Sequence, residues 1–325
     1  MSAGGATLRQ VLSDTTRIIK AHSRHFLALS MVFLFPISFS TFIYTSLLHP
    51  TSIHSYYRRS LYIFSTPNPN PNHSPLLLQI IYSLFVSILY ICATASISYS
   101  TFHGFYGRPV KFISSLKSIL FSFFPLLATV IVMQIIFVLI IFAFIILMLL
   151  TYNGLLLIGI EFDYDTVYFL VFVILIVALL VGVLIYLESE WYVSNVVVVL
   201  ESQWGFSPLR RSSYLVKGMK RVVFCMILLF GVFGAYFSFL CLSSGPKAGI
   251  LEGWFNWKVV LKMVLYTCFL TILSLYSVSA NTVLFIHCKA LHGEFAFEID
   301  HEEFAQEYVS LPREDGNVPY VVNVV

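Results

Sequence analysis

Charged side chains are scarce in this chain. Asp, Glu, Lys and Arg together make up 11% of its 325 residues, whereas a soluble domain carries about 25%. Hydrophobic residues make up 58%. This composition excludes an ordinary soluble domain. The formal net charge is only +3, so the placement of the charges is more informative than their sum, and we expect no nucleic acid partner.

The sequence also lacks the common catalytic and cofactor-binding motifs. It contains no glycine-rich nucleotide-binding loop, no HExxH metal motif and no GxSxG nucleophile motif. Its five cysteines form no CxxC pair and lie within or beside apolar stretches, which is typical of packing thiols. Glu161, Asp163 and Asp165 have the spacing that begins a calcium loop, but the later ligands and the glycine are missing. We therefore predict no catalytic activity, no cofactor and no metal site.

What the chain has instead is six long apolar stretches. Each exceeds the roughly 20 residues that an α-helix needs to cross about 30 Å of hydrocarbon. The stretches are Phe26–Leu48, Leu76–Tyr99, Ile119–Leu150, Val167–Leu187, Val222–Leu242 and Leu261–Ile286. Because backbone amides inside a bilayer must be hydrogen-bonded within helices, we predict an all-α, polytopic membrane helical bundle with six transmembrane helices.

The basic residues are distributed unevenly on the two sides of these stretches. Fourteen of the nineteen Lys and Arg residues fall on the side of both termini, and five fall on the other side. Since cytosolic loops carry an excess of Lys and Arg, this asymmetry predicts that both termini are cytosolic. The first stretch is too long for the core of a cleavable signal peptide, so we expect it to stay as a signal anchor. The expected membrane is the endoplasmic reticulum or the plasma membrane.

Three segments that precede odd-numbered stretches begin alike, with an apolar residue, one or two basic residues and then serine. They start at Leu8, Val110 and Leu209, which are 102 and 99 residues apart. Each leads through two stretches to a glycine that follows a His or an aromatic residue. This spacing predicts three parallel repeats, each an amphipathic helix plus a helical hairpin. The repeats lie at about 8–104, 110–205 and 209–293, and an acidic cytosolic tail follows at 294–325.

The segments that begin these repeats carry basic residues on amphipathic helices. In the first, Arg9, Arg17 and Lys20 lie away from the apolar face. Helices of this kind lie in the headgroup region and turn their basic groups toward anionic lipids. We therefore predict membrane lipids with anionic headgroups as partners at the cytosolic face. The candidate headgroup contacts in the third segment are Arg210, Arg211, Lys217, Lys220 and Arg221.

Two carboxylates, Glu188 and Glu190, follow the fourth apolar stretch and precede a further apolar run, Trp191–Leu200. A charged residue at the bilayer centre costs about 2.5–3.5 kcal/mol or more, so such residues usually face a bundle interior or an aqueous cavity. We favour a long or kinked fourth helix that holds both glutamates in its cytosolic half. The alternative is a helix that ends at Leu187, with the further run flat at the interface. With two asparagines at similar places in their repeats, the glutamates form a candidate polar path of Glu188, Glu190, Asn195 and Asn281.

Two regions of the sequence resemble known membrane proteins. Residues Leu200–Gly218, with Ser207-Pro208-Leu209-Arg210-Arg211-Ser212 at the centre, and residues Lys289–Pro312 look like a plant family of uncharacterised six-span transmembrane proteins. That resemblance covers nearly the whole chain. The first region is also distantly similar to the membrane domain fused to bacterial glycerophosphodiester phosphodiesterases. This second resemblance implies no enzyme activity, because the catalytic barrel of those fusions has no counterpart in the sequence.

These observations predict a multi-pass membrane protein without catalytic activity that acts as a membrane scaffold, binding or trafficking component. The tail after Gly293 is the expected site for a protein partner. The alternative is a transporter or channel for a small or amphipathic solute, in which the polar path conducts the solute. Neutralising Glu188 or Glu190 would abolish flux through a transporter, whereas a scaffold would show no flux.

Overall fold

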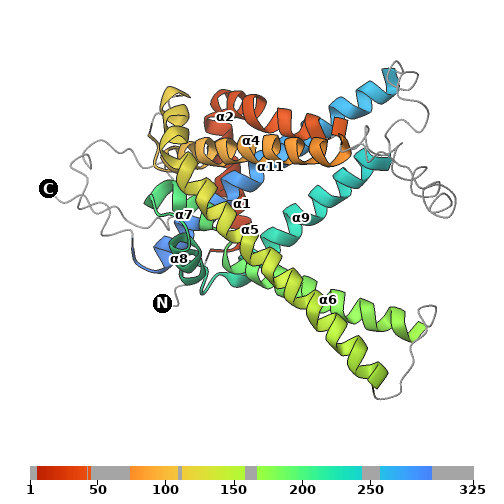
Figure 1. Cartoon of the computed structure of the whole chain (residues 1–325). Coiled ribbons are helices and arrows are strands. Elements are labelled where there is room, and N and C mark those ends of the chain that lie inside the picture. Colours follow the sequence, from red (N-terminus) through yellow and green to blue (C-terminus); the bar gives the residue numbers. More distant parts are fainter. Residues whose placement is uncertain are drawn as a thin grey trace.

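The computed structural model describes residues 6–41, 43–44, 74–108, 112–157, 167–243 and 257–294, which are almost entirely helical and include no strand. The predicted all-α class is confirmed for this part of the chain. The helices are α1 (Leu8–Ala21), α2 (Ser23–Leu29), the π-helix η1 (Ser30–Leu34), α4 (Ser74–Phe105), α5 (Phe112–Leu157), α6 (Val167–Glu190), α7 (Ser194–Glu201), α8 (Ser207–Leu215), α9 (Lys220–Ser243) and α11 (Trp257–Leu291). Figure 1 shows their arrangement.

Within the described residues, six helical segments are long and apolar enough to cross a membrane. They are Ser23–Thr41, Leu77–Phe105, Phe112–Gly154, Tyr168–Glu201, Lys220–Leu240 and Val260–Leu291. Each of the six predicted stretches overlaps one of these segments, so the predicted number of spans is confirmed and is consistent with an integral membrane protein. Several segments extend beyond the predicted apolar runs, because the helices continue into small and polar residues.

The first span changes helix type immediately before a proline. Pro36 has no backbone N–H, and in a regular α-helix its ring clashes with the carbonyl four residues earlier. In the structure the preceding turn, η1, is a π-helix, in which the backbone N–H of Phe35 donates to the carbonyl of Ser30. The wider turn accommodates the proline, and the span continues to Thr41.

Helices α4 and α11 form the centre of the bundle, where they pack against each other and against several other helices. Their buried surfaces are rich in small residues, including Ala93, Ala95, Ser279 and Ala280, all fully buried. Small side chains let helix axes approach closely in a membrane, where close packing replaces the hydrophobic effect as the driving force. The sequence therefore marks these two helices as the ones that other helices surround.

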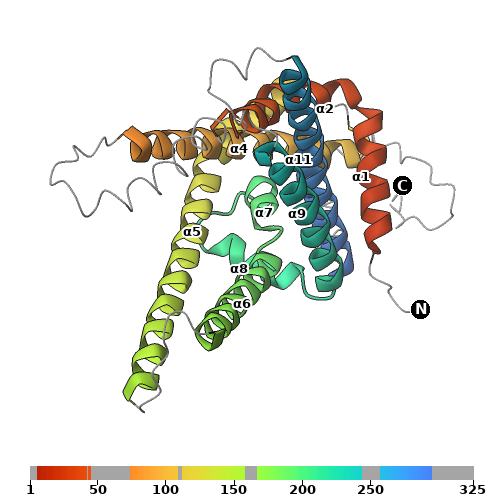
Figure 2. The same cartoon turned by 90° about the vertical axis from the view of Figure 1, so that its right-hand side faces the viewer.

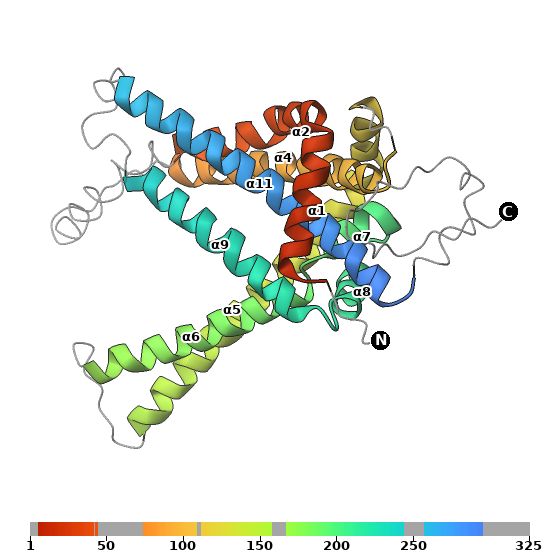
Figure 3. The same cartoon turned by 180° about the vertical axis from the view of Figure 1, so that it is seen from behind.

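Helices α5 and α6 form a hairpin that points away from the other helices in all three views (Figures 1, 2 and 3). No residue of the most apolar window of either helix is buried within the protein, whereas 56% of the corresponding window of α11 is buried. Beyond their contact with each other, α5 packs on α4 and α7, and α6 packs on α8 and α9. The hairpin thus leaves most of its apolar surface to its surroundings.

Helices α1, α7 and α8 lie toward one end of the bundle, here called the capped end (Figures 1 and 3). Helix α1 begins with a capping box between Thr7 and Gln10 and crosses α11 in Figure 3. At the crossing, the Oδ2 atom of Asp14 lies 3.1 Å from Nε2 of His287. The apolar face of α1 is buried in the main core, and its members are Val11, Thr15, Ile18 and Ile19. The predicted amphipathic helix is therefore present, docked on α11.

The fourth span is interrupted where the sequence analysis favoured a long or kinked helix. Helix α6 ends at Glu190, and the N–H of Ser194 donates to the carbonyl of Trp191 at 3.0 Å to form a tight turn. Helix α7 follows, and Val193 and four consecutive valines from Val196 are almost fully buried. Because α6 and α7 together make up the fourth candidate span, Tyr168–Glu201, with a tight turn between them, the expected kinked form describes this span, whereas an unbroken helix does not. The apolar run packs inside the bundle against α4, α5, α8 and α11 and does not lie flat at an interface.

Candidate functional site

The carboxylate of Glu190 forms an ion pair in the structure. Its side chain is only 8% exposed and accepts from Lys220 Nζ at the start of α9. Ser213 Oγ of α8 donates to Glu190 Oε2 at 2.6 Å, and Ser212 Oγ donates to the backbone carbonyl of Glu190 at 2.8 Å. Glu190 thus connects the end of α6 to α8 and to the start of α9. The charge of this carboxylate is matched and its lone pairs are used, so removing one partner would leave an uncompensated buried charge.

Arg211 of α8 lies between two carboxylates. Its guanidinium donates to Glu201, at the end of α7, over 3.1 and 3.3 Å, and to Glu294, just after α11, over 3.0 Å and a second, shorter contact. Lys289 of α11 also pairs with Glu201, with Nζ 3.4 Å from Oε1. Burial lowers the pKa of Arg211, but the hydrogen bonds that it donates to Glu294 and Glu201 outweigh burial and raise the pKa above its usual value. The guanidinium therefore stays charged and joins α7, α8 and the end of α11.

The remaining members of the predicted polar path lie elsewhere. Glu188, two residues before Glu190 and so about 200° away around the helix, is exposed and interacts electrostatically with Tyr90 and Tyr192. Asn281 of α11 donates from Nδ2 to the backbone carbonyl of Tyr192 at 2.8 Å. Asn195 lies on α7. The structure thus separates Glu190, which is part of an ion pair, from Glu188 and the asparagines.

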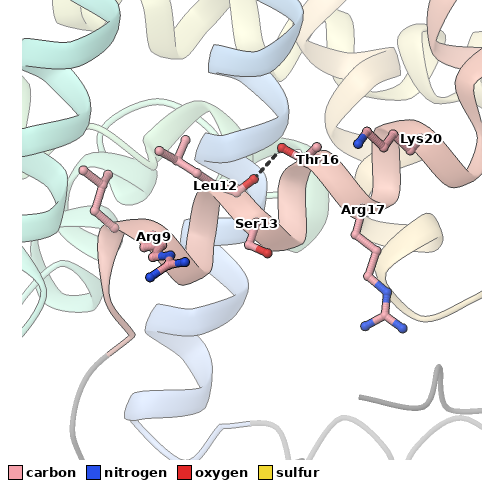
Figure 4. A pocket seen from close by; sticks show the side chains of 7 residues that line it. Arg9, Leu12, Ser13, Thr16, Arg17 and Lys20 are labelled. Carbon is pink, nitrogen blue, oxygen red and sulfur yellow. Dashed lines mark hydrogen bonds between the residues drawn. The ribbon is translucent and has the colours of Figure 1, made fainter. Parts of the chain in front are cut away.

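A basic face runs along the outside of α1. Its members Arg9, Ser13, Arg17 and Lys20 are exposed on the side away from the buried face. At 100° per residue the three basic residues lie within about 80° of each other around the helix, over a length of about 16 Å. They border a groove of about 740 Å³, whose described lining residues are Leu8, Arg9, Leu12, Ser13, Thr16, Arg17 and Lys20. Figure 4 shows the basic side chains projecting away from the helix axis.

The five predicted headgroup contacts divide into two groups. Arg211 and Lys220 are engaged in the ion pairs with Glu201, Glu294 and Glu190. The other three side chains, Arg210, Lys217 and Arg221, are exposed, and the structure gives them no ion pair with the described residues. Exposed guanidinium and ammonium groups at one end of a bundle can bind phosphate groups, whereas the paired ones serve the fold.

The ion pairs at the capped end were not predicted from the sequence. Glu201 lies ten residues before Arg211, and this neighbourhood of opposite charges is the available signal, whereas Glu294 lies 83 residues after Arg211 and gives no such signal. No three His, Cys, Asp or Glu side chains of the described residues gather to hold a metal ion. The acidic loop at Glu161–Asp165 and the tail from residue 295 onward lie outside the described residues.

Comparisons with known proteins place the chain in one family. No curated protein and no solved structure matches it. The profile of a domain of unknown function, DUF8558, matches residues 7–318, which is nearly the whole chain and includes all ten helices named above. The chain therefore belongs to the DUF8558 family.

Proposed function

We propose that this chain is a multi-pass membrane scaffold or binding protein without catalytic activity, which holds anionic lipid headgroups at the cytosolic face. The observation that carries the proposal is the two-sided character of α1. One side is buried in the core, while the other presents Arg9, Arg17 and Lys20 beside a groove of about 740 Å³. Helices with this division lie in the headgroup region, where each basic residue near an anionic surface contributes about 1 kcal/mol.

The cytosolic orientation of the capped end is part of this proposal. Fourteen of the nineteen Lys and Arg residues lie on the side of both termini, as cytosolic segments do. Arg210, Lys217 and Arg221 add exposed positive charge near α8, at the same end. The membrane is that of the endoplasmic reticulum or the cell surface, and the tail at 294–325 is the proposed docking segment for a protein partner.

The three-repeat organisation and the plant and bacterial resemblances also remain proposals. Two of the three glycines expected to end the repeats, Gly205 and Gly293, have positive φ, which supports a common turn. In the first repeat Gly104 lies inside α4 instead, and the positive φ occurs at Gly107, just after the helix end. Positive φ is easily reached by glycine, so each turn uses the residue type that it requires.

Lipid binding can be tested by native mass spectrometry of the purified protein with a phosphatidylinositol phosphate and with phosphatidylcholine. We expect the native chain to retain the anionic lipid preferentially, and the R9Q/R17Q/K20Q variant to lose most of that preference. Lys262→Gln removes an exposed charge from α11 and is the control for a general charge effect. Equal retention of the anionic lipid by the native chain and the triple variant would contradict the proposal.

Transport of a small or amphipathic solute is the second candidate, and one observation favours it. The Oδ1 atoms of Asn195 and Asn281 are buried and have no hydrogen-bond partner among the described residues, as expected of groups that serve a ligand. Cysteine accessibility across 186–204 in sealed vesicles separates the two functions. Periodic labelling that reaches Glu188 and Asn195 indicates a water-filled path, whereas labelling confined to residues after Leu200 indicates the dry, packed α7 of a scaffold.

A further inference from the structure

The chain leaves α11 through a turn that directs it at a basic side chain of the capped end. Gly293 has a φ of +72°, and the N–H groups of Gly293 and Glu294 each donate to a carbonyl of the last turn of α11 at 3.2 Å. This is a Schellman motif, in which a glycine ends a helix and changes the direction of the chain. Glu294 then accepts a hydrogen bond from Arg211 of α8 at 3.0 Å. The acidic tail, whose residues 295–325 lie outside the described part of the chain, thus begins at a carboxylate that is already paired with a basic residue.

Helix α1 lies within reach of this starting point. It crosses α11 where Asp14 Oδ2 lies 3.1 Å from His287 Nε2. Helix α11 ends at Leu291, so the crossing is about 6 Å from the helix end at 1.5 Å per residue. The whole of α1, with 14 residues, is about 21 Å long, and a tail of this length can extend over about 100 Å. The tail can therefore reach every part of the basic face of α1.

The tail and the basic face carry opposite charges. Arg9, Arg17 and Lys20 of the basic face are exposed, whereas Asp14, the one acidic residue of α1, meets His287 of α11. In the tail, seven Asp and Glu residues accompany one Arg and no Lys, and the acidic residues are Glu298, Asp300, Glu302, Glu303, Glu307, Glu314 and Asp315. Opposite charges attract over about 10 Å at 0.1 M salt, and the covalent link raises the effective concentration of the tail to about the millimolar range. The tail and the basic face are thus complementary in charge and stay close together.

The first part of the tail also matches α1 in the spacing of its side chains. In the groove beside the basic face, Leu8, Leu12 and Thr16 are each four residues apart, so they recur about every 6 Å along α1. In the tail, apolar and acidic residues occupy alternate positions, and residues two apart recur about every 6.6 Å on one side of an extended chain. The apolar residues are Phe295, Phe297 and Ile299, and the acidic ones are Glu298, Asp300 and Glu302. An extended segment along α1 would thus place apolar side chains in the groove and carboxylates beside the basic residues.

We propose that the tail segment 295–307 docks on the basic face of α1 and occupies the groove of about 740 Å³ beside it (Figure 4). The docked carboxylates pair with Arg9, Arg17 and Lys20 and so exclude anionic headgroups from the same side chains. Docking does not depend on lipid binding, whereas the competition between tail and lipid rests on the proposed function. A membrane rich in anionic lipid displaces the tail, because both bind the same three cations, and the tail is then released for the protein partner.

Docking can be tested by cross-linking within the full-length chain. Ser13→Cys introduces a thiol on the basic face, and His301→Cys introduces one among the acidic residues of the docking segment. On a cysteine-free background, in neutral detergent without anionic lipid, a short bifunctional thiol reagent should join the two within one chain. The yield should fall at least twofold at about 1 M salt, where the screening length is about 3 Å. A yield that is independent of salt would contradict an electrostatic contact.

Two tail variants with the same change in charge decide whether the contact is specific. E298Q/D300N removes two carboxylates from the docking segment and should lower the cross-linking yield at least twofold. E314Q/D315N removes two carboxylates beyond residue 307 and is the matched control, which should keep the native yield. The proposal is overturned if E298Q/D300N keeps the native yield, or if both variants lower the yield equally.

The same two tail variants test the competition in a chain that keeps its native cysteines. In native mass spectrometry, E298Q/D300N should bind a phosphatidylinositol phosphate at least about twofold more tightly than the native chain, because the apparent affinity is proportional to the fraction of time that the basic face is free. E314Q/D315N should bind the lipid as the native chain does. Equal affinity of E298Q/D300N and the native chain would refute the competition. Cross-linking without any lipid preference would contradict the proposed function alone, and lipid preference without cross-linking would contradict the docking alone.

Discussion

Replacement of Arg211 by alanine should destabilise the protein by about 2–3 kcal/mol. The change removes the guanidinium that joins Glu201 to Glu294, including contacts of 3.1, 3.3 and 3.0 Å. Hydrogen bonds to charged groups contribute about 1.5–3 kcal/mol each, and breaking a buried pair costs about 3–5 kcal/mol. The side chains of Arg211, Glu201 and Glu294 are 25%, 12% and 26% exposed. Solvent therefore screens these contacts, and the expected loss in the free energy of unfolding is about 2–3 kcal/mol.

The measurement is reversible unfolding in mixed micelles with increasing denaturing detergent. Arg210→Ala is the matched control, because Arg210 is the neighbouring exposed residue and should change the free energy of unfolding by no more than about 0.5 kcal/mol. Arg211→Lys keeps the charge but not the two-pronged geometry and should fall between the two. If Arg211→Ala unfolds at the same detergent fraction as Arg210→Ala, the guanidinium does not join the three helices and the reasoning fails.

Three further predictions concern the capped end and α7. Gly218→Ala should destabilise the protein by about 1–3 kcal/mol in the same assay, because the φ of Gly218 is +99° and a Cβ there would lie 2.9 Å from a leucine of α11. A variant as stable as the native chain would contradict this. Glu190→Gln should cost about 1–2 kcal/mol because it weakens the pair with Lys220, whereas Glu188→Gln should leave stability nearly unchanged. A cysteine at Val197, on a cysteine-free background, should resist a small aqueous thiol reagent that labels one at Trp204, since the native side chains are 0% and 71% exposed.

The number and place of the spans follow from the sequence because the bilayer imposes a length and a composition. A run as long and apolar as Ile119–Leu150 is stable only as a helix that spans the membrane, so α5 was predictable. The amphipathic α1 was equally predictable, because its basic and apolar residues alternate with the period of a helix. Both features depend on residues close together in the chain.

The break at Glu190 and the ion pairs were not predictable in the same way. The run Trp191–Leu200 is apolar, and a segment buried among other helices has the same composition as one that faces lipid. The partners in the pairs are far apart in sequence, since Glu190 and Lys220 are 30 residues apart and Arg211 and Glu294 are 83 apart. Hydropathy along the chain does not indicate which helix ends pack against each other.

The length of α5 has a consequence for the membrane around the protein. Its apolar segment Phe112–Gly154 has 43 residues and is about 65 Å long at 1.5 Å per residue, about twice the thickness of the hydrocarbon layer. A helix of this length must tilt, extend beyond the hydrocarbon or thicken the bilayer locally, and the required tilt changes with bilayer thickness. The most apolar windows of α5 and α6 are unburied, so most of the hairpin would face lipid, while the part of α5 that packs on α4 and α7 fixes its direction relative to the bundle. A bilayer of ordinary thickness therefore covers only part of α5, and the rest of the helix extends beyond the hydrocarbon or the bilayer deforms around it.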